Sequence, residues 1–77
     1  MPRITPTDWR TQVRIFEAYG CVFVRQKGDH LIYRCPGARR PVVIPRYGEI
    51  TVTVIRANMR TVGMTREKYF ELLERTK

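Results

Sequence analysis

The residues best suited to chemistry lie in one stretch, Arg25 to Arg34, which reads RQKGDHLIYR. It holds the only histidine of the chain, His30, together with the cations Arg25, Lys27 and Arg34. Nearby cations disfavour a charged imidazole, and a neutral imidazole can act as a general base. A base that takes the proton of a ribose 2′-hydroxyl makes that oxygen attack the adjacent phosphate, while arginine and lysine stabilise the phosphoryl charge. The stretch therefore suits metal-free and cofactor-free cleavage of RNA.

The same residues also fit functions without chemistry. Arg25 and Lys27 could anchor phosphates in a non-catalytic RNA-binding module whose open face reads A-form shape and 2′-hydroxyls. The basic face could instead dock an acidic protein partner. A histidine beside a hairpin turn is, in many proteins, only a surface residue. These alternatives remain open at this point.

Charge and length narrow the class of partner. The chain has 77 residues and a net charge of +8, from fifteen Lys and Arg against seven Asp and Glu. We expect one domain over residues 1–77, with a core too thin to enclose a pocket, so that any activity sits on an open face. Most of the cations are arginine, which holds phosphate through paired hydrogen bonds and stacks on bases. This composition favours a nucleic-acid partner.

The remaining composition predicts a cytoplasmic protein with no metal and no small-molecule cofactor. We expect Cys21 and Cys35 to be free thiols in a reducing cytoplasm, because one cysteine pair without a signal peptide is no disulfide framework. One histidine and two cysteines without ligand spacing predict no metal site. The apolar runs are far too short to span a membrane.

The spacing of apolar residues, and the residues that begin or end helices and strands, predict the elements that position the histidine. A first helix is expected from a Thr5 cap to Gly20, with Trp9, Val13 and Phe16 facing the core. Strands are expected at 21–27, 30–35 and 41–45, then a helix at about 53–62 and a last helix capped by Thr65. The predicted fold is α+β with order αβββα. A three-stranded antiparallel sheet carries the helices on one face, and a short extra C-terminal helix follows.

The hairpin predicts where His30 points. If Gly28 and Asp29 form a two-residue turn, His30 lies opposite Lys27. Continuing this pairing places Arg25 opposite Ile32, Val24 opposite Tyr33, Phe23 opposite Arg34 and Val22 opposite Cys35. Alternation then predicts a core face of Val22, Val24, Leu31, Tyr33 and Cys35, and an open face of Phe23, Arg25, Lys27, His30, Ile32 and Arg34. The opposite register would bury three cations at high cost.

With these elements and residues in place, the chain resembles the HicA-like (YcfA-like) toxins of toxin–antitoxin systems. The resemblance rests on Gly20, on RQKGDH at 25–30 followed by Ile32-Tyr33-Arg34, on Val43-Ile44-Pro45 and on Val62-Gly63-Met64-Thr65. It implies a fold like a double-stranded-RNA-binding domain and an mRNA interferase, a metal-independent endoribonuclease. It also implies that His30 is catalytic and that a HicB-like antitoxin covers the active face.

Two positions depart from the family pattern. Asp29 stands where serine is most common, and Tyr47 stands where many members have a second histidine. With His30 alone, a mechanism that uses two histidines is excluded. The leaving-group proton would then come from water, Lys27, Tyr47 or His30 acting in turn. We expect RNA contacts at Arg25, Lys27, Arg34, Arg39, Arg40 and Tyr47.

Overall fold

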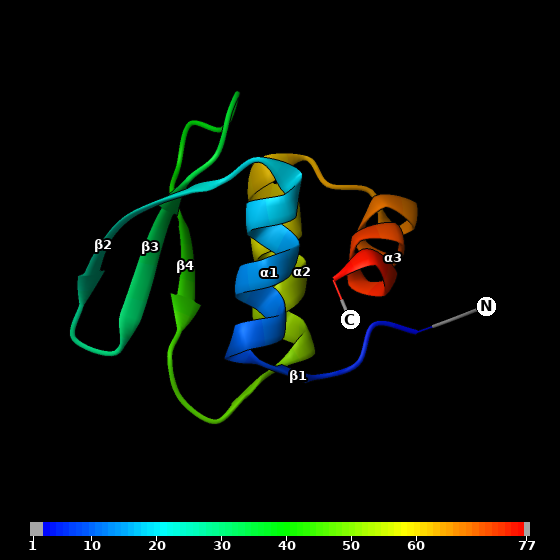
Figure 1. The fold of residues 1–77 in the computed structure, drawn as a ribbon, viewed down its shortest axis with the longest axis horizontal. Helices are drawn as coiled ribbons and strands as arrows, with labels where there is room; N and C mark the ends of the chain where they lie inside the picture. Colours follow the sequence, from blue (N-terminus) through cyan, green and yellow to red (C-terminus); the bar gives the residue numbers. More distant parts are fainter. Residues whose placement is uncertain (1–2, 77) are drawn as a thin grey trace.

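The computed structural model describes residues 3–76 and arranges them as a sheet, a pair of helices and an outer helix (Figure 1). In chain order the elements are β1 (Thr7–Asp8), α1 (Trp9–Tyr19), β2 (Val22–Lys27), β3 (His30–Arg34), β4 (Val42–Pro45), β5 (Glu49–Ile50), α2 (Val52–Val62) and α3 (Arg66–Arg75). The succession α1–β2–β3–β4–α2 confirms the predicted αβββα order, and α3 is the extra C-terminal helix. Strands β2, β3 and β4 form an antiparallel sheet in that order. The α+β fold therefore agrees with a double-stranded-RNA-binding-domain-like architecture.

The core lies between the sheet and the helix pair. Alternate residues of β3 and β4 are buried and meet buried residues of α1 and α2; the set is Leu31, Tyr33, Val42, Ile44, Ile15, Phe16, Ile55 and Met59. Within the described chain, no helix covers the other face of the sheet (Figure 1). All six residues of β2 are exposed, because this edge strand lies beyond the helices. The prediction of helices on one face is confirmed.

The first helix begins later than the sequence pattern predicts. Its N-cap is Asp8, whose carboxylate accepts a hydrogen bond from the Thr11 amide at 2.9 Å, so the expected Thr5 cap is wrong. The reason is a short pairing of Thr7–Asp8 with Glu49–Ile50, which keeps the chain extended up to Asp8. The predicted end is confirmed, since Gly20 has a φ of 115° and its amide bonds back to the last turn.

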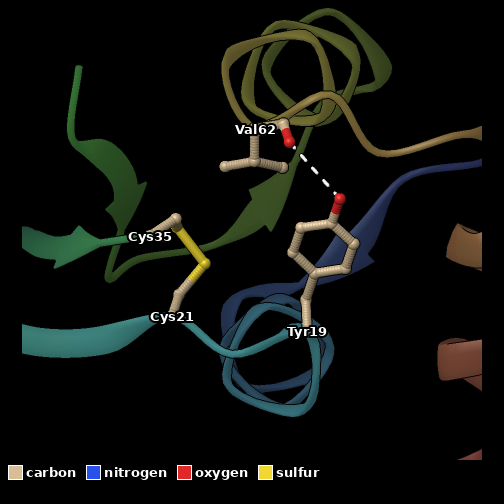
Figure 2. Close-up of a disulfide and its surroundings, with 4 residues drawn as sticks. All are labelled: Tyr19, Cys21, Cys35 and Val62. Carbon is tan, nitrogen blue, oxygen red and sulfur yellow. Dashed lines mark hydrogen bonds between the residues drawn. A yellow bond between two sulfur atoms is a disulfide. The ribbon is translucent and has the colours of Figure 1, made fainter. Parts of the chain in front are cut away.

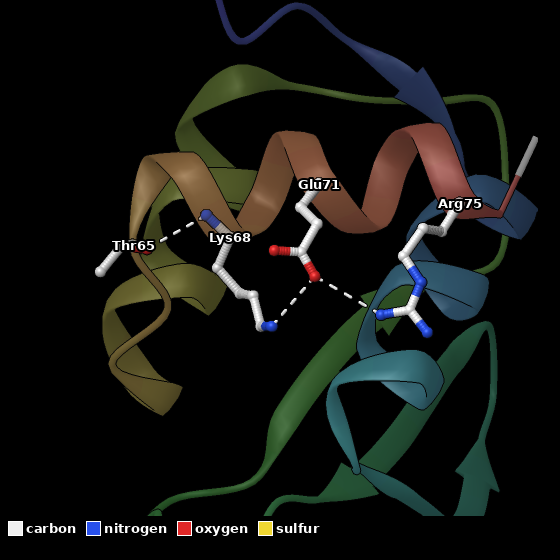
Figure 3. Close-up of polar contacts among 4 residues, drawn as sticks. All are labelled: Thr65, Lys68, Glu71 and Arg75. Atoms are coloured by element: carbon white, nitrogen blue, oxygen red, sulfur yellow. Dashed lines mark hydrogen bonds and ion pairs between the residues drawn. The ribbon is translucent and has the colours of Figure 1, made fainter.

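The other two helices end and begin close to the predicted residues. Helix α2 starts after a Thr51 cap and stops at Gly63. Thr65 caps α3, accepting a hydrogen bond from the Lys68 amide at 3.1 Å (Figure 3). Farther along α3, the Glu71 carboxylate bridges the Lys68 ammonium at 3.1 Å and the Arg75 guanidinium at 3.4 Å. None of the helices in residues 3–76 has the length and apolar character that a membrane span requires.

Helix α3 is joined to α1 by a buried polar contact. Gln12 is 1% exposed, and its amide donates to the Tyr69 hydroxyl at 3.0 Å and to the Thr7 hydroxyl at 2.8 Å. Burial raises the pKa of Tyr69, so its hydroxyl stays neutral. This contact holds the outer helix on the side of α1 that faces away from the sheet.

A β-bulge in β2 overturns part of the predicted register. Near the turn, Lys27 lies opposite His30 and Arg25 opposite Ile32, as predicted. The next pair, however, is Phe23 with Tyr33, which leaves Val24 as the extra residue of the bulge.

Beyond the bulge every predicted pair is shifted by one residue. Val22 lies opposite Arg34, so the expected pairs of Val22 with Cys35, Val24 with Tyr33 and Phe23 with Arg34 are wrong. The extra residue reverses the alternation, which turns Phe23 toward the face of Tyr33, with ring centroids 5.6 Å apart, so the expected place of Phe23 on the open face is wrong. Val22 and Val24 are 65% and 51% exposed, so their expected place on the core face is wrong as well.

The same shift accounts for the cysteines. Continuing the observed register by one residue sets Cys21 opposite Cys35, and the two form a disulfide with a Cα–Cα distance of 4.1 Å (Figure 2). The expectation of two free thiols is therefore wrong. Both cysteines are buried beside the point where the Tyr19 hydroxyl donates to the Val62 carbonyl at 3.3 Å. The disulfide closes the open end of the hairpin next to the C-terminal ends of α1 and α2.

Loss of the disulfide should destabilise the fold measurably. Replacing Cys21 and Cys35 together by alanine opens a loop with a sequence separation of 14, and a loop of that size is worth about 3 kcal/mol in the unfolding free energy. Urea titrations of the wild type with and without dithiothreitol should show the same loss. The double variant is the control, because reductant should not change it. Equal midpoints for oxidised and reduced wild type would contradict the expectation.

Candidate functional site

The single histidine sits at the start of the middle strand. His30 is the first residue of β3, opposite Lys27 on β2 and opposite Pro45 on β4. The turn before it has Gly28 at its first position with a φ of 59°, which fits a type II′ hairpin turn. Pairing on both sides fixes the backbone of His30, while its side chain is exposed.

The imidazole is free to meet a ligand. Among residues 3–76 it makes no hydrogen bond and no ion pair, so neither ring nitrogen is committed to a protein group. The ring of Tyr47 meets it edge to face, with centroids 6.3 Å apart and an interplanar angle of 86°. Tyr47 is itself 57% exposed. The pair therefore places an exposed imidazole and an exposed phenol ring next to each other.

The loop that carries Tyr47 is tied to the hairpin turn. The Arg46 amide donates to the Asp29 carbonyl at 2.6 Å, which joins the exit of β4 to the residue before His30. The Arg46 guanidinium lies over the Trp9 ring at 5.3 Å from its centroid, and Arg10 lies over the same ring at 4.9 Å. Asp29 thus contributes its backbone to the site. Arg46 was missed by the sequence analysis, although it adjoins Tyr47.

The other expected residues lie farther along the same face. Alternation along β3 puts His30, Ile32 and Arg34 on one side of the sheet, and Arg25 joins them through its pairing with Ile32. The predicted sharing of one face by His30, Lys27, Arg25 and Arg34 therefore agrees with the strand register.

An open groove of about 810 Å³ lies on this face. Four of the six expected RNA contacts line it, namely Arg25, Arg34, Arg39 and Arg40, and so do Val22, Val24 and Ile32. His30, Lys27 and Tyr47 do not line it. The structure thus divides the expected site into a histidine end (His30, Lys27 and Tyr47) and an arginine groove that begins at Ile32.

The electrostatics of this face favour an anionic ligand. In the described part of the chain, none of the cations Arg25, Lys27, Arg34, Arg39 and Arg40 is in an ion pair. Uncompensated charge of one sign raises the local concentration of a polyanion. Residues 3–76 also contain no group of three or more His, Cys, Asp and Glu side chains arranged to hold a metal ion.

Comparison with known proteins identifies the family. The family model for HicA toxins of bacterial toxin–antitoxin systems matches residues 9–64, from the first residue of α1 to just beyond α2. The chain belongs to the HicA toxin family. Searches of curated proteins and of solved structures found no match to it. As a HicA-family toxin, the protein is expected to have an antitoxin partner. The matched segment contains the whole open face and ends before α3.

Proposed function

We propose that this HicA-family toxin is an mRNA interferase, a metal-independent endoribonuclease that uses His30 as its general base. The observation that carries the proposal is the exposed, uncommitted imidazole of His30, held by strand pairing on both sides beside Lys27. A general base needs an atom that is free to accept the proton it abstracts. His30 meets this requirement in the structure as it stands.

The reaction needs only groups that the open face supplies. His30 takes the proton of a ribose 2′-hydroxyl, and that oxygen attacks the adjacent phosphorus. The bond from phosphorus to the 5′-oxygen breaks, which leaves a 2′,3′-cyclic phosphate and, after one proton is added, a 5′-hydroxyl. Lys27 and Arg25 stabilise the charge that builds on the phosphoryl oxygens. No metal or cofactor takes part in these steps.

Tyr47 is the proposed donor of the proton to the leaving oxygen. Its ring and the imidazole lie edge to face with centroids 6.3 Å apart, and both side chains are exposed. Lys27 then keeps its charge throughout, which suits a phosphate anchor better than a proton donor. The division gives each of the three residues at the histidine end one role.

The partner and the compartment follow from the same function. A HicB-like antitoxin would neutralise the toxin by covering the open face, and the toxin would act in the cytoplasm, where mRNA is translated. The disulfide between Cys21 and Cys35 is uncommon for that compartment. It lies away from the histidine end, so the proposed chemistry does not depend on its redox state.

Replacing His30 tests the proposal directly. His30→Ala should slow RNA cleavage by about 10²- to 10⁴-fold, because the general base is lost, and should abolish toxicity in cells. EDTA should leave wild-type cleavage unchanged. Because His30 is exposed, the variant should keep the wild-type circular dichroism spectrum. Lys68→Ala, which removes an exposed charge on α3, is the control and should cleave normally. Cleavage by His30→Ala at the wild-type rate would refute the proposal.

The alternative is a non-catalytic RNA-binding module, which the uncompensated cations of the open face favour. Under this alternative, incubated RNA stays intact and its affinity falls steeply with salt. Gel analysis separates the two functions, because fragments support cleavage and shifted full-length bands support binding alone.

The role of Tyr47 has its own test, based on the leaving group. Tyr47→Phe should lower kcat on RNA by about 10- to 10²-fold with little change in KM, because a proton donor is lost but the ring remains. A uridine 3′-(p-nitrophenyl phosphate) substrate has a leaving group that needs no proton, so Tyr47→Phe should cleave it at nearly the wild-type rate. His30→Ala should be slow on both substrates. An equal defect of Tyr47→Phe on both would exclude Tyr47 as the acid.

A further inference from the structure

The β-bulge determines part of the lining of the arginine groove. With an unbroken register, Val22 and Val24 would share the face of Tyr33, away from the cations. The extra residue instead places both valines along the lining of the groove, together with Ile32. Their side chains are 65% and 51% exposed, which is unusual for apolar residues beside so much charge. The groove therefore combines an apolar surface with guanidinium groups.

The groove continues directly from the histidine end. Ile32 is the next residue after His30 on the same face of β3, roughly 7 Å along the strand, and Arg34 lies roughly 14 Å from His30. Beyond Arg34, the loop that joins β3 to β4 carries Arg39 and Arg40, and both line the groove. A chain bound at His30 and extending along β3 would pass these residues in turn.

We propose that this groove holds an unpaired stretch of the RNA substrate on one side of the phosphodiester bond whose cleavage His30 catalyses. The proposal rests on the ribonuclease function proposed above and extends it to the state and the path of the substrate. The arginines hold successive phosphates, and the faces of the bases lie against Val22, Val24, Ile32 and the guanidinium planes.

The chemistry of the lining favours an unpaired strand over a duplex. A duplex offers phosphates and 2′-hydroxyls at its surface but hides the faces of its bases in the stack. Single strands expose both, and proteins bind them by pairing a basic groove with surfaces on which bases stack. A site for duplex phosphates alone would have no use for three apolar side chains between the arginines.

The continuity of the groove with His30 favours RNA over an acidic protein segment as its occupant. An acidic peptide would satisfy the arginines equally well. It would not, however, explain why the groove starts at Ile32, the residue next to His30 on the same face of β3. Protein docking is therefore the outcome that the test must separate.

The test measures binding, so that it does not depend on cleavage. Labelled 2′-O-methyl RNA oligonucleotides lack the attacking hydroxyl and cannot be cut. Fluorescence anisotropy with the wild type should show that a hexanucleotide binds at least about tenfold more tightly than a dinucleotide, because the longer strand reaches the groove. Extending the strand from its 5′ end and, separately, from its 3′ end will show on which side the groove lies.

Two double variants separate the two parts of the lining. Arg39→Ala with Arg40→Ala should remove most of the gain from length and lower the slope of log K against log salt by about 1.4, which corresponds to two single-strand phosphate contacts. Val22→Ser with Val24→Ser should weaken hexanucleotide binding about threefold or more without changing that slope. Both pairs are exposed, so the variants should fold normally.

The matched control removes the same charge elsewhere. Arg14→Ala with Arg56→Ala takes two exposed arginines from α1 and α2, which pack on the other face of the sheet. It should retain the gain from length. A fully paired RNA hairpin is the second control, and its affinity should not depend on Val22 and Val24.

The outcomes distinguish the two proposals. If the Arg39 and Arg40 variant keeps the full gain from length, or if the hairpin shows the same dependence on the valines, the groove proposal is wrong. If that variant binds RNA normally but loses affinity for its purified antitoxin, the groove is a protein-docking site and the proposal is equally wrong. Normal cleavage by His30→Ala would overturn only the proposed catalytic role of His30, since the binding measurements would stand.

Discussion

The β-bulge at Val24 is the constraint on which the open face of this protein depends. One strand has to satisfy two registers. At the turn, Lys27 must oppose His30, and at the other end Cys21 must oppose Cys35. The two conditions differ by one residue, and the bulge supplies it. The same residue turns Phe23 onto the ring of Tyr33 and sends the valines to the arginine groove, so the disulfide and the groove have a common origin.

Approximate free energies explain why the bulged register is more stable than an unbroken one. The disulfide contributes about 3 kcal/mol and the edge-to-face aromatic pair about 1 kcal/mol. The bulge disrupts the backbone hydrogen bonds between β2 and β3 at Val24, which costs on the order of 1 kcal/mol. An unbroken register would not recover much hydrophobic energy, because β2 lies beyond the helices and would leave the valines exposed on either face. An edge strand is therefore where an extra residue costs least.

Most of the fold was predictable because its signals are local. Gly20, Gly63 and Thr65 mark helix ends through backbone conformation and capping, and Gly28-Asp29 marks the turn. The bulge was not predictable, since Val22-Phe23-Val24 is apolar throughout and alternation cannot tell one register from the next. The pairing of β1 with β5 is too short for a periodic signal, and it alone moved the start of α1. The roles of the site residues rest on chemistry that neither pattern nor register decides.

The separation of the open face into two parts has a physical reason. A thin core cannot enclose a site, so each part must be held by pairing along the sheet. His30 is held by being in the middle strand, with β2 and β4 on either side and the Arg46 amide bonded to the Asp29 carbonyl. The arginine groove lies partly on the exposed edge strand β2, and the buried disulfide between Cys21 and Cys35 ties the start of that strand to the end of β3. Covalent stabilisation thus lies at the end of the face where β2 enters the sheet, and the imidazole lies at the end where strand pairing on both sides already holds it.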